Sequence, residues 1–66
     1  SVQNFTLMIF NRWGQLIWES NDIRVGWDGT YKNKNVPDGT YTYKIEYQLS
    51  NGEQKESITG HLNLLR

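Results

Sequence analysis

The chain has no cysteine, a single proline and a single histidine, and its 7 basic residues are balanced by 7 acidic ones. The absence of cysteine excludes disulfides, thiolate zinc sites and cysteine nucleophiles. Because the basic residues are scattered among acidic ones, the chain also has no positive stripe that could follow a nucleic-acid backbone. We therefore expect no nucleic-acid binding, and the sequence points to no cofactor.

Long apolar segments are missing as well. No run approaches the roughly 18 residues of a membrane-spanning helix, and the N-terminus lacks the basic, apolar and small-residue pattern of a signal peptide. No apolar pattern of period 3.6 persists for about ten residues, so we predict no helix. We expect neither membrane insertion nor an N-terminal signal peptide in this sequence.

Aromatic residues, by contrast, are plentiful, with three Trp, four Tyr and two Phe among 66 residues. A single domain of this size buries only about 60% of the surface that its unfolded chain exposes. Each aromatic side chain can bury up to about 150–250 Å². We expect the rings to form most of a small core and the stability to be modest.

Alternating patterns in the first third of the chain predict a hairpin. Residues 4–11 alternate with period 2 and carry apolar side chains on both faces, which is typical of an inner strand. Residues 12–15 interrupt the pattern, with Gly14 available for a left-handed turn position, before residues 16–18 resume it. Residues 23–25 indicate a weak strand or a loop.

A longer strand and its partner are predicted in the second half. From Thr40 to Leu49, apolar and aromatic residues occupy one face and polar residues the other. Asn51-Gly52 predicts a type I′ hairpin, after which the returning strand carries apolar side chains on one face. Gly60 lies where a side chain would crowd the core or where a bulge bends that strand. The simplest interpretation is an all-β, antiparallel β-sandwich of about five to seven short strands.

Two dense turn clusters bracket a polar tip within residues 26–41. Trp27 is a large apolar anchor, and we expect Asp28 and Asp38 to accept hydrogen bonds from backbone N–H groups two residues on. Asn33 is expected in the left-handed region. Calcium binding is disfavoured, because the oxygen-bearing residues lack the spacing of a calcium loop and two lysines lie among them. We assign folding roles to the following residues: Trp27, Asp28, Gly29, Pro37, Asp38, Gly39, Tyr41 and Tyr43.

Few residues are candidates for chemistry. His61 alternates with Gly60 and Leu62 and should face solvent, and no nucleophile or orienting partner can be named for it. We predict no enzymatic activity and no metal site. The turn Arg12-Trp13-Gly14 could be a binding tip, or the Arg12 guanidinium could stack on an indole to cover the core.

Five motifs occur in an order typical of a known family: IFNRWGQ (residues 9–15), LIWES (16–20), GWDGT (26–30), PDGTYTY (37–43) and GHLNLLR (60–66). Together they resemble the gliding-motility-associated C-terminal domain of Bacteroidetes, the type B sorting domain of the type IX secretion system. The resemblance covers nearly the whole chain as one domain. Asn33 stands where family members often have Gly, and Asn is the commonest substitute in a left-handed position.

The resemblance implies an immunoglobulin-like sandwich at the C-terminus of large exported proteins, including gliding adhesins. Such a domain is an address that the outer-membrane translocon and its accessory proteins read, and its cargo passes through the periplasm to the cell surface or the medium. Family members usually carry an upstream segment that leads into a first strand. We expect this strand to be missing here, which leaves a sheet edge open to homo-oligomer formation.

The sequence thus predicts a non-enzymatic C-terminal secretion signal that is recognised through protein contacts. We assign recognition to the first turn and to the terminal strand: Arg12, Trp13, Gly14, Gly60, Leu62, Leu64, Leu65 and Arg66. Two alternatives stay open, a carbohydrate-binding or adhesive module that uses Trp13, Trp18 and Tyr31, and a structural immunoglobulin-like spacer.

Overall fold

The computed structural model describes residues 2–49 and 54–65 of the chain. Six strands form within these residues, and no helix does, in agreement with the sequence. The all-β class is therefore confirmed. The strands are β1 (Val2–Phe10), β2 (Leu16–Ser20), β3 (Thr30–Tyr31), β4 (Lys34–Asn35), β5 (Gly39–Leu49) and β6 (Lys55–Leu64).

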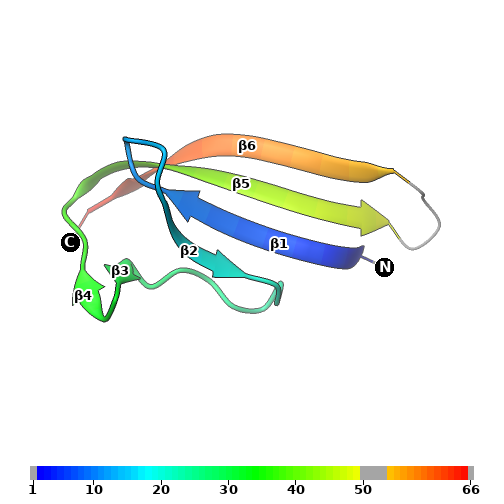
Figure 1. The fold of residues 1–66 in the computed structure, drawn as a ribbon, viewed down its shortest axis with the longest axis horizontal. Coiled ribbons are helices and arrows are strands. Elements are labelled where there is room, and N and C mark those ends of the chain that lie inside the picture. Colours follow the sequence, from blue (N-terminus) through cyan, green and yellow to red (C-terminus); the bar gives the residue numbers. More distant parts are fainter. Residues whose placement is uncertain (1, 50–53, 66) are drawn as a thin grey trace.

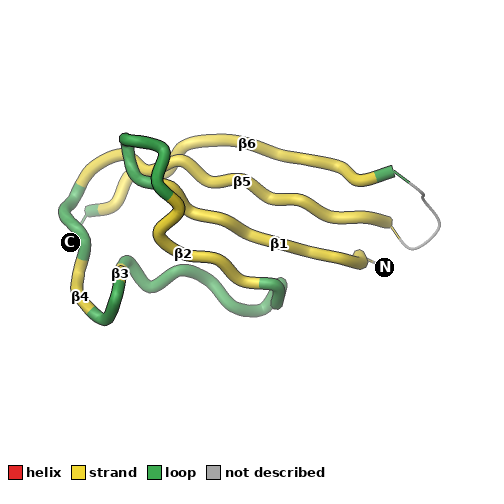
Figure 2. Tube along the Cα trace, in the orientation of Figure 1, coloured by secondary structure: helices red, strands yellow, loops and turns green. Residues whose placement is uncertain are grey.

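Four of the strands make one antiparallel sheet in the order β2-β1-β5-β6, and β3 and β4 make a separate two-stranded sheet (Figure 1). The inner position of β1 agrees with the apolar side chains predicted on both its faces. Figure 2 shows the loop that follows β2 running back toward β3. As a result, the β3–β4 hairpin lies at the same end of the large sheet as the turn between β1 and β2.

The segment between β2 and β3 is a loop, which settles the choice that residues 23–25 left open. The Asp22 backbone N–H donates to Ser20 Oγ at 3.0 Å, and the Val25 N–H donates to the Asp22 carbonyl at 3.0 Å. These turn hydrogen bonds break the extended conformation. Ile23 and Val25 remain 64% and 46% exposed, so they contribute little to the core.

The β3–β4 hairpin turns on Lys32 and Asn33, whose φ angles are 53° and 66°. Two central residues with positive φ are the mark of a type I′ turn, which matches the twist of the flanking strands. The prediction for Asn33 is confirmed. Lys32 shares the left-handed conformation, which the sequence did not indicate because lysine has no special preference for it.

The core lies at the end of the large sheet that carries the β1–β2 turn. We call this region the turn end, and it consists of residues 11–15, residues 36–41 and Leu65. Ile9, Ile17 and Tyr41 are its only buried apolar side chains among the described residues, at 2%, 8% and 7% exposure. The β1–β2 register shifts between Ile9, opposite Trp18, and Phe10, opposite Leu16, so Ile17 is an extra residue. Such a bulge breaks the period of two, and both Ile17 and Trp18 belong to the core cluster.

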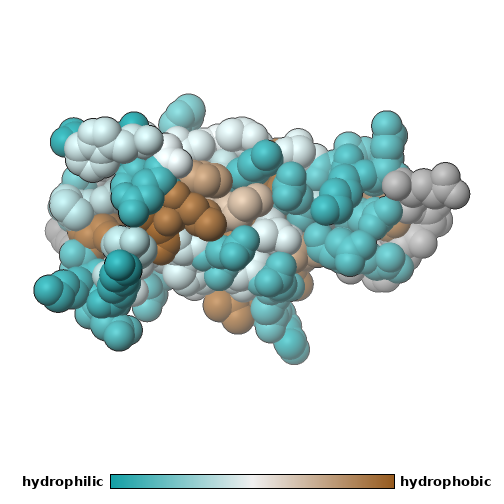
Figure 3. Space-filling view, in the orientation of Figure 1, coloured by the Kyte–Doolittle hydropathy of each residue, from teal (hydrophilic) through white to brown (hydrophobic). Residues whose placement is uncertain are grey.

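Coverage of the large sheet is uneven. Tyr31 of the small sheet packs against the core cluster, whereas Leu49 and Ile58 of the large sheet are 46% and 45% exposed. On the face drawn in Figure 3, apolar surface gathers toward the turn end, and the opposite end is hydrophilic. A complete immunoglobulin-like sandwich, with its first strand missing from this chain, stays a prediction.

The β5–β6 pairing is continuous from Gly39 opposite Leu64 to Gln48 opposite Lys55. The returning strand predicted from the sequence is therefore present, with no bulge. The predicted Asn51-Gly52 turn lies outside the described residues. The polar face of β5 is half-buried rather than fully exposed, because β5 is an inner strand with neighbours on both sides.

Candidate recognition surface

The turn between β1 and β2 is built by the Asn11 side chain. Asn11 Oδ1 accepts hydrogen bonds from the backbone N–H groups of Trp13 at 3.0 Å and Gln15 at 2.9 Å. Gly14 has a φ of 81° and donates its N–H to the Asn11 carbonyl at 3.0 Å. The left-handed position predicted for Gly14 is confirmed, and its place in this turn follows from its lack of a Cβ atom.

Arg12 and Trp13 project from this turn. The Arg12 guanidinium carbon lies 4.5 Å from the centroid of the Trp13 ring, which is a cation–π contact. Trp13 is 77% exposed, so the pair does not cover the core. The stacking predicted as one alternative therefore occurs, but on a side chain that remains available for contacts with a partner.

Trp27 and Asp28, to which the sequence assigned folding roles, make contacts just before and within β3 and with Tyr41. The Trp27 indole N–H donates to the Thr30 carbonyl at 3.0 Å, and its ring meets the Tyr41 ring edge-on at 5.2 Å between centroids. Asp28 Oδ1 accepts hydrogen bonds from the Thr30 N–H at 3.1 Å and from its hydroxyl at 2.7 Å. The predicted turn chemistry of Asp28 is therefore present.

The second turn cluster is hydrogen-bonded to Gly29 and to Tyr41. Gly29 has a φ of 81° and accepts a hydrogen bond from the Val36 N–H at 3.0 Å. The Tyr41 hydroxyl donates to the Pro37 carbonyl at 2.6 Å, which ties the segment before β5 to the core. Gly39 and Asp38 continue this segment at the surface.

The terminal strand divides into inward and outward residues. Leu62 and Leu64 pack against the core cluster, and Gly60 lies under the Tyr43 ring. Leu65 is 83% exposed, and Arg66 lies outside the described residues. Within the recognition set assigned from the sequence, the structure therefore places Arg12, Trp13, Gly14 and Leu65 on the surface.

These elements converge at one end of the sheet. Gly39 and Tyr41 of β5 pair with Leu64 and Leu62 of β6, and residues 39–41 also line a cavity with the β1–β2 turn. This region is the turn end. Of the two segments that the sequence assigned to recognition, the β1–β2 turn lines the cavity together with β5, and the end of β6 pairs with β5 but contributes no residue to the lining.

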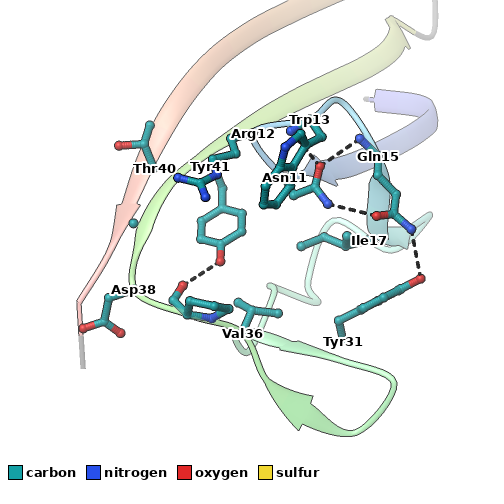
Figure 4. A pocket seen from close by; sticks show the side chains of 12 residues that line it. Asn11, Arg12, Trp13, Gln15, Ile17, Tyr31, Val36, Asp38, Thr40 and Tyr41 are labelled. Carbon is teal, nitrogen blue, oxygen red and sulfur yellow. Dashed lines mark hydrogen bonds between the residues drawn. The ribbon is translucent and has the colours of Figure 1, made fainter.

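The cavity at the turn end has a volume of about 490 Å³. The rings of Trp13, Tyr31 and Tyr41 lie around Ile17 in Figure 4, with Val36 completing the apolar lining. The Gln15 side-chain amide donates to the Tyr31 hydroxyl at 3.4 Å and so joins two walls. Asn11, Gln15 and Val36 were not singled out from the sequence, because their place here depends on how distant segments pack.

His61 is exposed, as its alternation predicted. Among residues 2–49 and 54–65, no group of three or more His, Cys, Asp or Glu side chains could hold a metal ion. No described helix is long and apolar enough to cross a membrane. The turn end combines a cavity, aromatic rings and a positively charged side chain. Surfaces that bind other proteins use features of this kind.

The family model of the CHU_C type IX secretion signal domain matches residues 1–64. The chain therefore belongs to this family of secretion signal domains, as its motifs predicted. No curated protein and no solved structure matches the chain.

Proposed function

We propose that this domain is a non-enzymatic C-terminal address that the type IX outer-membrane translocon reads through protein contacts at the turn end. The observation that supports the proposal is the exposed Arg12–Trp13 pair beside a cavity that is also lined by β5, the strand with which β6 pairs. Exposed aromatic and arginine side chains beside a pocket are the usual anchors of protein interfaces.

The proposed route leads through the periplasm to the cell surface or the medium. Its partners are the translocon and its accessory proteins. Of the recognition residues, Trp13, Arg12 and Leu65 would touch these partners directly. Gly60, Leu62 and Leu64 would act by holding the strand in place, since they lie on the core side of the sheet.

The carbohydrate-binding alternative receives less support. Trp18 and Tyr31 pack against the core cluster, so these two rings do not form an exposed row with Trp13. A spacer role would not require an exposed indole held by a guanidinium at one end of the domain.

We also propose that the open edge of β6 allows association of two copies. This strand has ten residues, and among the strands of the described residues it pairs on one side only, with β5. A long edge without proline offers unpaired backbone groups to another strand. The edge runs along all of β6 and reaches the turn end only near Leu64, so each proposal has a test of its own.

The experiment is a fusion of this chain to the C-terminus of a periplasmic reporter in a host that has a type IX translocon. The reporter is expected at the cell surface, and in a strain without the translocon it should stay in the periplasm. Equal surface display in the two strains would show that another route carries the domain. The same fusion without residues 1–66 is the matched control.

A further inference from the structure

We infer that the cavity at the turn end binds a bulky apolar side chain of an acidic peptide segment. The inference rests on the proposed function, because the peptide would belong to the machinery that reads the domain. It goes further by giving the site an occupant of stated chemistry. Three features carry it: the rigid walls, the use of the polar lining groups, and the charges around the rim.

The walls of the cavity are held in place without a ligand. The Asn11 side chain fixes the turn that carries Trp13, and the Tyr41 hydroxyl fixes the segment that starts at Pro37. Gln15 links the β1–β2 turn to Tyr31. Because these hydrogen bonds come from three separate parts of the chain, a side chain entering the cavity would not have to order it first.

Most polar atoms in the lining are already used by these contacts. Asn11 Oδ1 accepts two backbone hydrogen bonds, and Asn11 Nδ2 donates to Gln15 Oε1 at 3.0 Å. The Gln15 amide and the Tyr41 hydroxyl each donate within the protein. A sugar needs many free hydrogen-bonding partners, whereas an apolar side chain needs none, so the lining favours the latter.

Two cations stack on the rings of the cavity. Arg12 lies over Trp13 at 4.5 Å, and Lys32 Nζ lies over the Tyr31 ring at 5.4 Å. Neither cation forms a salt bridge within the described part of the chain. The lining also contains one carboxylate, Asp38. The two cations outnumber it, so these three side chains together carry a formal charge of +1 (two positive charges and one negative) and complement negative charge next to the apolar group.

The test uses three capped pentapeptides with the isotope-labelled chain: Asp-Asp-Phe-Asp-Asp, Asp-Asp-Ala-Asp-Asp and Lys-Lys-Phe-Lys-Lys. Nuclear magnetic resonance follows the Trp13 indole N–H and the Gln15 side-chain amide. The acidic phenylalanine peptide is expected to shift both signals at the lowest concentration. Its binding should weaken with added salt, because the rim charges are exposed to solvent.

Matched variants distinguish the loss of a charge at the cavity from a loss of folding. Arg12→Gln and Lys32→Gln should each lower the affinity for the acidic phenylalanine peptide about two- to fivefold, the size typical of one exposed ion pair. Arg24→Gln removes an exposed arginine outside the cavity and should leave the affinity for this peptide unchanged. Trp13→Ala should abolish the shift at Gln15, and the remaining spectrum reports whether each variant is folded.

Several outcomes would overturn the inference. These are equal binding of the acidic and basic peptides, shifts that map outside the cavity, and no shift up to the solubility limit. Shifts with maltohexaose but not with the phenylalanine peptide would overturn it in favour of a sugar site. The reporter experiment stands apart, because the fusion can reach the surface whether or not these peptides bind.

Discussion

The ring of Tyr43 on β5 covers Gly60 on β6 directly across the strand pair. A Cβ atom at Gly60 would meet the hydroxyl oxygen, Cζ and Cε2 of that ring, the last at 2.8 Å. Since real Cβ atoms almost never lie so close to a neighbour, the ring would have to move. The pair explains why the strand predicted to carry apolar residues has a glycine at its centre.

Gly60→Ala is therefore expected to destabilise the domain by about 1–3 kcal/mol, the cost of overpacking a well-packed site. Chemical denaturation measures the change. In a Tyr43→Leu background the same substitution should cost less, because the ring it displaces is gone. Equal costs in both backgrounds would mean that the contact does not decide the residue at position 60.

The pairing of β5 with β6 was foreseeable, and the contact of Tyr43 with Gly60 follows from its register. Alternation and turn residues also predicted the β1–β2 hairpin, the all-β class and the left-handed positions at Gly14 and Asn33. These features depend on residues that are near in sequence or on a simple period, so local physical chemistry determines them.

What the sequence did not reveal depends on distant contacts. The bulge at Ile17 appears only when β1 and β2 pair, and the cavity forms only when residues 36–41 fold back toward the turn at residues 11–15. Trp13 lies in a polar turn and is exposed, whereas Trp18 follows Leu16 and Ile17 in a strand and packs against the core. That Trp13 lines a cavity with residues 36–41 could not be read from its neighbours in the sequence.

The two tryptophans outside β2 should differ strongly in their effect on stability. Trp27→Ala removes a ring that packs against Tyr41 and a hydrogen bond to Thr30, and we expect a loss of about 3 kcal/mol. Trp13→Ala removes an exposed ring and should change the free energy of unfolding by less than about 0.5 kcal/mol. Denaturant titration of both variants makes the comparison, and similar losses would contradict it.

Asp22 should titrate below the usual aspartate range. The Arg24 side chain and then the Arg24 backbone N–H donate hydrogen bonds to its carboxylate, and they lower its pKa. Because the folded pKa lies below the unfolded one, this contribution to stability is present above about pH 4. It is lost as the pH falls through the folded value.

The measurement is a titration of the Asp22 carboxyl group by nuclear magnetic resonance. In Arg24→Ala the side-chain hydrogen bonds are lost, and the midpoint should move up toward the ordinary value. The backbone hydrogen bond remains in that variant, so the return is expected to be partial. A midpoint that does not move would exclude the guanidinium as the main cause.

Association through the β6 edge should respond to a charge on that strand. Ile58→Lys places a charge on an edge strand, where natural sheets use it to block pairing, and it should reduce the mass measured by light scattering. Leu49→Lys is the matched control, because Leu49 has nearly the same exposure, 46% against 45%, but lies on an inner strand. A wild-type chain that is monomeric at all concentrations would refute the association.

The central claim, that the turn end is read during export, is tested most directly by the surface yield of the reporter fusion in two double variants. Trp13→Ala with Leu65→Ala removes two exposed side chains at the turn end, and Leu49→Ala with Ile58→Ala removes two partly exposed ones outside it. We predict that the first variant leaves the reporter in the periplasm and that the second is exported like the unaltered domain. Equal surface yields for the two variants, with both folded, would contradict the claim.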